Sequence, residues 1–176
     1  MNMRDMKIIQ SYTIKEVQKC EYDQIIEFVM KIRKEIFPML CQEQLPSDLL
    51  HFEQYYVQPE NSAFFAAFSE DGTVLGTIGV CPYDGRFDQL QGCYDLPKTA
   101  EIVRCYMDPN YRRLGIGTAL FKKVTSFSRE AGYQTLYLHT HPFLPGAIPF
   151  WKAQGFVDRL AEADPVWKTL HMDKKL

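Results

Sequence analysis

The chain has 176 residues, of which 46% are hydrophobic and 24% are charged. This is enough for one domain with its own apolar core, spanning residues 1–176, and no stretch is long and apolar enough to cross a membrane. A net charge of −2 argues against general binding to nucleic acid or to an anionic membrane surface.

The first ten residues, MNMRDMKIIQ, lack the apolar segment of a signal peptide, so we expect a cytoplasmic protein. Five cysteines are present, an odd number, and no two of them have C-x-x-C spacing. They therefore favour reduced thiols over a disulfide framework, and we expect no metal site. The cysteines are Cys20, Cys41, Cys81, Cys93 and Cys105.

The N-terminal third predicts one strand and two helices. Lys7 to Lys15 has the β-rich composition of a strand. Tyr22 to Phe37 predicts an amphipathic helix, because its apolar residues recur at helical spacing. A second helix runs towards Tyr56, with Ser47 or Asp48 as its N-cap.

A hairpin and a long loop follow. Ala63 to Phe68 and Val74 to Cys81 read as two strands joined by a turn at Glu70-Asp71-Gly72. Pro82 to Thr99 is longer than an ordinary connection, which favours a functional loop. Its candidate contacts to a substrate are Tyr83, Asp84, Arg86, Asp88 and Tyr94.

The centre of the chain predicts a strand, a turn and a helix. Glu101 to Met107 has the composition of a buried strand, and Asp108-Pro109-Asn110 ends it. The helix that follows has one apolar face and a plausible stop at Gly132. That face carries Leu120, Val124, Phe127 and Ala131.

The turn before this helix favours capture of an anion. The first amides of a helix lack internal partners, and the helix dipole adds positive charge there. Gly115 and Gly117 let a phosphate approach the backbone, while Arg112 and Arg113 add full charge. The alternative is a tight turn without a ligand. The spacing is neither G-x-G-x-x-G nor a Walker A loop.

The last quarter predicts a strand, a short helix and a hairpin. Thr135 to Thr140 reads as a strand, and Ala147 to Gln154 as a helix. The final hairpin has a loop at Asp158 to Pro165 and a return strand at Val166 to Met172. His139 and His141 suit hydrogen-bonding, general-base or purely structural roles better than metal binding, since no third ligand is near.

The run E-I-V-R-C-Y-M-D-P-N-Y-R-R-L-G-I-G-T-A-L resembles the signature of the GCN5-related N-acetyltransferase (GNAT) superfamily. Ala147 to Phe156 resembles a second family motif, A-I-x-F-Y-x-x-x-G-F. The resemblance implies an α/β fold: a mixed, mostly antiparallel sheet of six or seven strands with about four helices. Strands 101–107 and 135–140 would be parallel and splayed at a cofactor cleft.

The resemblance also implies acetyl-coenzyme A as co-substrate. In the family, the R/Q-x-x-G-x-G/A turn binds the pyrophosphate, and the preceding strand lies against the pantetheine arm. The residues expected to bind the cofactor are Tyr106, Met107, Arg112, Arg113, Leu114, Gly115, Ile116, Gly117, Thr118, Phe150 and Trp151.

The reaction sets three tasks: deprotonation of the amine, stabilisation of the oxyanion and protonation of the leaving thiolate. Many family members carry a glutamate base at the position of Glu101; the alternative is a carboxylate paired with Arg104 or Lys98. A backbone amide near Tyr106 or Met107 would stabilise the oxyanion. Trp151 stands where the family often has a tyrosine, and an indole cannot protonate a thiolate.

Three outcomes follow from that substitution. A different side chain takes over proton donation, the thiolate leaves unprotonated, or catalysis is weak. An alkyl thiol has a pKa near 8–9, so the second outcome demands little. The candidate donors are Tyr106, Tyr137 and His141.

The leading hypothesis is therefore an N-acetyltransferase acting on a small primary amine by direct attack in a ternary complex. Acidic residues on the two expected acceptor walls would suit a cation. The alternatives are a protein or peptide acetyltransferase and a non-catalytic acyl-coenzyme A-binding module. Family members are often dimers, and the sequence does not decide between dimer and monomer. The wall residues are Glu43, Asp48, Asp158, Glu162 and Asp164.

Overall fold

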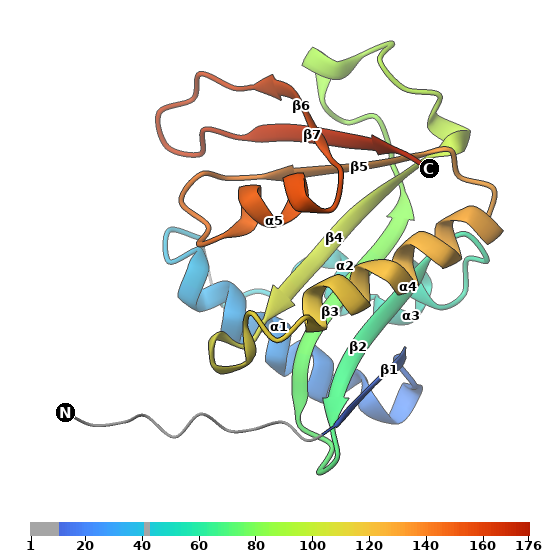
Figure 1. The fold of residues 1–176 in the computed structure, drawn as a ribbon, viewed down its shortest axis with the longest axis vertical. Coiled ribbons are helices and arrows are strands. Elements are labelled where there is room, and N and C mark those ends of the chain that lie inside the picture. Colours follow the sequence, from blue (N-terminus) through green and yellow to red (C-terminus); the bar gives the residue numbers. More distant parts are fainter. Residues whose placement is uncertain (1–10, 41–42) are drawn as a thin grey trace.

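The computed structural model describes residues 11–40 and 43–176, and its centre is a seven-stranded sheet (Figure 1). The strand order is β1-β2-β3-β4-β5-β7-β6, and only β4 and β5 pair in parallel. This confirms the mixed, mostly antiparallel sheet. The strands are β1 (Tyr12–Glu16), β2 (Ala63–Ser69), β3 (Val74–Pro82), β4 (Thr99–Met107), β5 (Thr135–Thr140), β6 (Val157–Ala161) and β7 (Leu170–Lys175).

Helices cover both faces of the sheet (Figure 1). One face carries α4 and α5, and the other carries α1, α2 and α3. None of the helices in the described part of the chain has the length and apolarity that a membrane crossing requires. The helices are α1 (Tyr22–Ile36), α2 (Ser47–Leu50), α3 (Phe52–Tyr56), α4 (Ile116–Glu130) and α5 (Ala147–Ala153).

The two helical layers explain the apolar character of the central strands. β2 reads AFFAAFS without alternation because both of its faces are buried. Under α4, Leu120 and Val124 join the core that contains Leu136. On the opposite face, Ile25 and Val29 of α1 join a second core. The apolar residues that recur at helical spacing in α1 and α4 are therefore the residues that each helix buries against the sheet.

β4 and β5 pair only at their beginnings and then diverge. The paired residues are Thr99 with Thr135, Ala100 with Leu136, and Glu101 with Tyr137. Beyond them the parallel ladder stops, although β4 continues for six residues to Met107 and β5 for three to Thr140. The expected splay of this strand pair is confirmed.

A bulge in β4 accompanies the divergence. The register between β3 and β4 shifts between Thr77 and Gly79, so that two residues of β4 oppose one of β3. Arg104 lies at the bulge with φ of 51°, and its carbonyl accepts a hydrogen bond from Thr77 Oγ1 at 2.9 Å. A bulge bends its strand, which turns β4 away from β5.

Three expected boundaries were wrong or incomplete. The segment ending at Tyr56 forms two short helices broken at His51, and Pro46 rather than Ser47 or Asp48 occupies the N-cap. The Asp48 side chain pairs with Arg104 instead of capping its helix. The first strand is described only from Tyr12, and residues 7–10 of that prediction lie outside the described residues.

The last hairpin also differs from the prediction. The expected loop at 158–165 contains most of β6, and the return strand begins at Leu170 rather than Val166. The Asp164 carboxylate accepts hydrogen bonds from the amides of Val166 and Trp167 at 3.0 and 2.6 Å. This side-chain turn holds the apolar residues 166 and 167 out of the sheet.

Candidate active site

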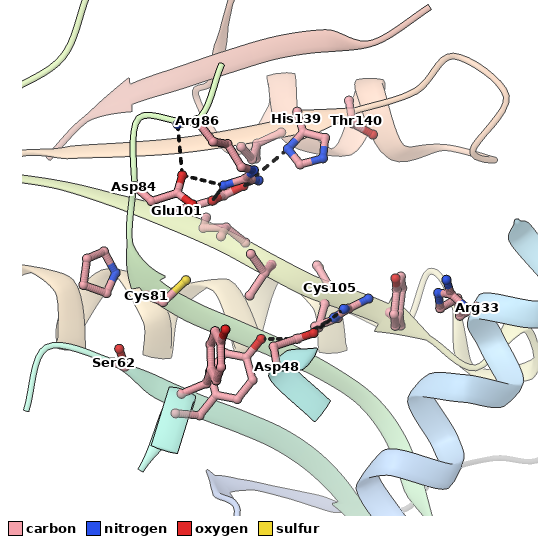
Figure 2. A pocket seen from close by; sticks show the side chains of 18 of the residues that line it. Arg33, Asp48, Ser62, Cys81, Asp84, Arg86, Glu101, Cys105, His139 and Thr140 are labelled. Atoms are coloured by element: carbon pink, nitrogen blue, oxygen red, sulfur yellow. Dashed lines mark hydrogen bonds and ion pairs between the residues drawn. The ribbon is translucent and has the colours of Figure 1, made fainter. Parts of the chain in front are cut away.

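A cleft with a volume of about 770 Å³ opens where β4 and β5 diverge (Figure 2). Its lining comes from both faces of the sheet. Ile102, Leu138 and Trp151 belong to the core under α4. Tyr56 and Tyr106 belong to the core on the α1 side. The cleft therefore passes through the sheet, with apolar lining from α5 on one face.

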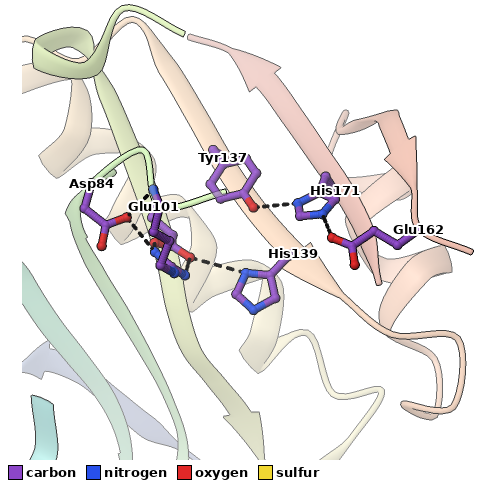
Figure 3. A network of polar contacts seen from close by, with 7 residues as sticks. Asp84, Glu101, Tyr137, His139, Glu162 and His171 are labelled. Atoms are coloured by element: carbon purple, nitrogen blue, oxygen red, sulfur yellow. Dashed lines mark hydrogen bonds and ion pairs between the residues drawn. The ribbon is translucent and has the colours of Figure 1, made fainter. Parts of the chain in front are cut away.

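On the α1 side the cleft holds an ion-pair network around Glu101 (Figures 2 and 3). The Glu101 carboxylate is 2% exposed and accepts two hydrogen bonds from the Arg86 guanidinium, at 2.6 and 2.7 Å. Arg86 also donates to Asp84 at 2.9 Å. His139 Nδ1 lies 3.3 Å from Glu101 Oε1, a contact that is electrostatic because the hydrogen-bonding angle is not met.

These neighbours keep Glu101 ionised. Burial alone would raise the pKa of Glu101, but the bonds from Arg86 and the nearby His139 outweigh it, so the pKa lies below its ordinary value. A carboxylate held this way is a weak proton acceptor. The expected partners were wrong: Lys98 pairs with Asp95 at 3.8 Å, and Arg104 pairs with Asp48.

His139 and His141 differ in what they offer to a substrate. The His139 side chain is 31% exposed, lines the cleft and faces the Glu101 carboxylate. His141 also lines the cleft but is 8% exposed, and its Nδ1 lies 3.1 Å from the Trp167 carbonyl. Burial lowers the pKa of His141. The structure thus brings His139 beside the carboxylate, and the catalytic role expected of His141 stays a prediction.

A second buried ion pair forms the opposite wall. Arg104 donates to both oxygens of Asp48, at 2.6 and 2.9 Å, and Tyr56 donates to the same carboxylate at 2.6 Å. Asp48 and Arg104 side chains are each 18% exposed. This pair fastens α2 to the bulge of β4, which explains why Asp48 does not cap its own helix.

The acidic walls are largely neutralised within the protein. Of the five acids expected there, Asp48 is the one that lines the cleft. Glu162 contacts His171 Nε2 at 2.6 Å, and Asp158 pairs with Lys152 at 3.0 Å. Asp164 accepts backbone amides, and Glu43 is exposed. Their number is therefore no argument for a cationic acceptor.

The turn before α4 has the geometry of an anion site. Gly115 is the N-cap, with φ of 79° and no heavy atom within 4 Å of where a Cβ would lie. The first intrahelical bond runs from the Ala119 amide to the Gly115 carbonyl at 3.0 Å. The three amides before it are those that a helix leaves for an external acceptor. They belong to Ile116, Gly117 and Thr118.

The other predicted cofactor contacts divide between accessible and buried groups. Leu114 is 46% exposed, whereas the Ile116 side chain is 1% exposed, so Ile116 offers only its backbone. Phe150 packs under the turn: a Cβ on Gly117 would lie 3.3 Å from its ring. Arg113 has φ of 62°, and Met107 packs against the core under α4. The diphosphate of coenzyme A fits this turn, and the binding roles stay predictions.

Two proposed proton donors and two thiols can be assessed. Tyr106 lines the cleft, but Tyr137 is fully buried and its hydroxyl is engaged with His171 Nδ1 at 2.7 Å (Figure 3). Tyr137 is not among the residues that line the cleft. Burial raises the pKa of both Cys81 and Cys105, which line the cleft, to about 12. Neither thiol is an activated nucleophile.

No group of three His, Cys, Asp or Glu side chains that could hold a metal ion occurs in the described ranges. Sequence reasoning had no means of pairing Arg86 with Glu101 or of ranking His139 above His141. The one signal for Arg86 was its place in the long connection at 82–99. The alternation of side chains in β5 puts residues 137, 139 and, if continued, 141 on one face, so this signal marks His139 without ranking it above His141.

Comparisons with known proteins give the same picture. Residues 26–156 match the acetyltransferase (GNAT) family. A probable N-acetyltransferase camello from Xenopus tropicalis is 31% identical over 129 residues, covering 73% of this chain and 54% of that protein. Human N-acetyltransferase 8 is 29% identical over 112 residues, covering 64% and 46%. The chain thus spans about half the length of these curated relatives.

Solved structures share the fold. A GNAT-family acetyltransferase from Staphylococcus aureus has a TM-score of 0.76 at 22% identity, covering 94% of this chain and 99% of that one. The PaiA N-acetyltransferase from Thermoplasma acidophilum, solved with coenzyme A, has a TM-score of 0.70 at 18% identity. The match includes 100% of that protein's chain and 95% of this one.

Proposed function

The chain belongs to the acetyltransferase (GNAT) family, whose members use acetyl-coenzyme A, and we propose that it acetylates the primary amine of a small molecule in a ternary complex. The observation that carries this proposal is the cleft through the sheet. It joins an apolar channel on one face, lined in part by α5, to a polar chamber on the other. The start of α4, with its open amides, packs against the same helix α5 through Gly117 and Phe150. A charged, elongated thioester and a polar amine need such different surroundings.

The α4 side of the cleft suits coenzyme A. The amides of residues 116–118, with Arg112 and Arg113, hold the diphosphate. Ile102, Leu138 and Trp151 line the channel for the pantetheine arm. When bound there, acetyl-coenzyme A supplies an acetyl group activated as a thioester.

On the α1 side, the chain must remove a proton from the incoming amine. His139 accepts that proton, because its ring faces the cleft while the other side of the ring faces Glu101. Glu101, fixed by Arg86, orients the imidazole and stabilises its positive charge. His139 passes this first proton to solvent, and the neutral amine nitrogen attacks the thioester carbon. As the C–N bond forms and the C–S bond breaks, the coenzyme A thiolate departs and the second nitrogen proton leaves through the same imidazole.

Transfer is direct rather than through an acetylated cysteine. Cys81 and Cys105 have raised pKa values of about 12, so thiolate is scarce at either position. The oxyanion is stabilised by an amide of Tyr106 or Met107, next to the β4 bulge. Trp151 leaves the departing thiolate without a phenol, which a thiol of ordinary acidity tolerates.

Coenzyme A release with a panel of primary amines tests the proposal. We expect His139→Asn to lower kcat by about a hundredfold. His51→Asn, an exposed histidine at the break between α2 and α3, is the matched control and should leave kcat unchanged. Wild-type turnover that survives His139→Asn would exclude this base.

A non-catalytic acyl-coenzyme A-binding module is the second candidate, favoured by Trp151 at the position of the tyrosine. Calorimetry separates the two. Tight binding of acetyl-coenzyme A without transfer to any amine or to a peptide library would select the binding module. Turnover of peptides alone would select a protein acetyltransferase.

A further inference from the structure

Four aromatic side chains come together at one end of the cleft. The ring centroids of His141 and Phe143 lie 5.1 Å apart with the planes stacked, and Trp167 lies 5.4 Å from His141. Phe37 completes the set at 5.8 Å from His141 and 6.3 Å from Trp167. These rings come from three separate segments: the end of α1, the loop after β5 and the loop between β6 and β7. We call them the aromatic subsite.

The aromatic subsite is part of the cleft wall rather than of the core. Phe37, His141 and Trp167 line the cleft, together with Leu40 and Leu144. None of the four rings belongs to the three buried cores of the described residues. Phe143 is 39% exposed. Rings left at a cleft wall present their faces to whatever enters it.

Charged groups of both signs lie near the aromatic subsite: Glu162 acts electrostatically on His141, and the Asp164 carboxylate accepts the Trp167 amide at 2.6 Å. Burial, aided by His139, lowers the pKa of His141, so this ring is neutral at pH 7. Arg33, one helical turn before Phe37, is the charged residue of α1 that lines the same cleft. The carboxylates Asp84 and Glu101 lie with Arg86 near His139 instead. The polar cluster at His139 thus receives the amine, and the ring faces are left for the rest of the acceptor.

The spacing between the two sites sets the length of the acceptor. The ring centroids of His139 and His141 lie 6.0 Å apart, and the Trp167 ring lies 5.4 Å from that of His141. A nitrogen at His139 thus places a group two to four bonds away, about 3 to 6 Å, against His141 and Trp167. Amines with a short spacer between nitrogen and ring match this geometry.

We propose that the aromatic subsite binds the apolar group of the acceptor, so that the preferred substrates are arylalkylamines with a short spacer. This inference rests on the proposed function, because it places the amine at His139. An aryl group stacks against several rings, whereas a linear alkyl chain contacts them over less area.

The test compares phenethylamine, n-butylamine and putrescine as acceptors for the wild-type chain and for Trp167→Ala. We expect kcat/KM for phenethylamine to exceed that for the other two by about tenfold or more, and Trp167→Ala to remove this preference. Val166→Ala is the matched control, because Val166 is the neighbouring residue and is 58% exposed. It should leave the ratio unchanged.

Binding measured without turnover keeps the inference separate from the proposed function. Calorimetry of phenethylamine with the protein–coenzyme A complex should give an affinity that falls about tenfold in Trp167→Ala and in Phe37→Leu. If this affinity change is found without any acetylation, the aromatic subsite stands and the proposed function fails. Equal use of the three amines, or equal losses for all three in Trp167→Ala, overturns the subsite. Thermal midpoints show whether each variant folds.

Discussion

Glu101 is the residue whose surroundings most change its interpretation. A strand-end glutamate in this sequence invites a role as base, yet the structure fixes it between Arg86 and His139. Arg86 lies 15 residues earlier, in a loop whose course local sequence rules do not determine. The residue could be predicted, but its partner could not, and the partner decides how basic the carboxylate is.

Replacing Arg86 with leucine should reverse the sign of the contribution that Glu101 makes to the pH dependence of stability. In the wild type the folded pKa of Glu101 is below the ordinary 4.5, so its contribution to stability exists at neutral pH and is lost as pH falls through the lowered value. Without Arg86, burial dominates and the pKa rises. The variant's stability is then highest at low pH and declines as pH rises through the new value.

Thermal or urea unfolding from pH 4 to pH 8 measures this effect. The deficit of Arg86→Leu should be about 3 kcal/mol at pH 7, the low end for a broken buried pair because Arg86 is partly exposed, and smaller at pH 4. Arg129→Leu, an exposed arginine near the end of α4, controls for general loss of charge. A deficit independent of pH would contradict the assigned pairing.

The Asp48–Arg104 pair should show strong coupling. Asp48→Asn leaves Arg104 and the Tyr56 hydroxyl with a poorer acceptor, at a cost of about 2 to 3 kcal/mol in unfolding free energy. The double variant Asp48→Leu with Arg104→Met should lose less than Asp48→Leu alone, because no charge is then buried without its partner. Urea unfolding of the cycle measures the coupling, and additive losses would argue against it.

Trp151→Tyr returns a phenol to the family's usual position. Trp151 is 6% exposed and packs against Phe121, Phe150 and Phe156, so the smaller ring should lower stability by about 1 to 3 kcal/mol. We expect kcat to change by less than about threefold, since a coenzyme A thiolate leaves without assistance. Steady-state kinetics decides: a tenfold increase would show that proton donation limits the native enzyme.

At the level of the elements, periodicity located most strands and helices but not all of their ends. β5 was placed without error at 135–140, because Gly132 and the histidine loop bound a clear apolar run. β7 was misplaced, because Val166 and Trp167 look like strand residues while the Asp164 carboxylate holds them in a turn. Side-chain capture of backbone amides leaves little trace in hydrophobic pattern.

The turn before α4 allows a matched pair of glycine variants. Gly115 and Gly132 flank the same helix, have φ of 79° and 85°, and have open space around a future Cβ. Alanine at either position should cost about 1 kcal/mol of stability through backbone strain. Only Gly115→Ala should also weaken coenzyme A binding, by about tenfold, because it lies at the helix start. Calorimetry with equal affinities in both variants would remove the diphosphate from this turn.

At the level of the whole molecule, the 83–98 loop is tied to the sheet by three carboxylates. Arg86 binds Glu101, Gln89 donates to Glu162, and Tyr94 donates to Asp173 at 2.9 Å. The loop was predicted to be functional for its length alone. Its attachment to β4, to β7 and to Glu162 just after β6 joins segments far apart in sequence, which no local pattern reveals. The family resemblance supplied the sheet and the splay, and the structure supplied these cross-links.

Hydrogen exchange provides a test that covers the whole chain. Adding coenzyme A should slow exchange in residues 102–107, 114–118 and 138–140, which surround the cleft and the helix start. β1, at the far edge of the sheet, serves as the internal control and should not change. Protection confined to other segments would place the nucleotide elsewhere.

A cleft that is lined from both faces of the sheet allows each reactant a separate entrance. On the proposed function, the thioester enters from the α5 side and the amine from the α1 side, so that either reactant can bind or leave while the other is in place. Initial-rate plots should then intersect, with either reactant able to load first, and each product should compete with the reactant that shares its entrance.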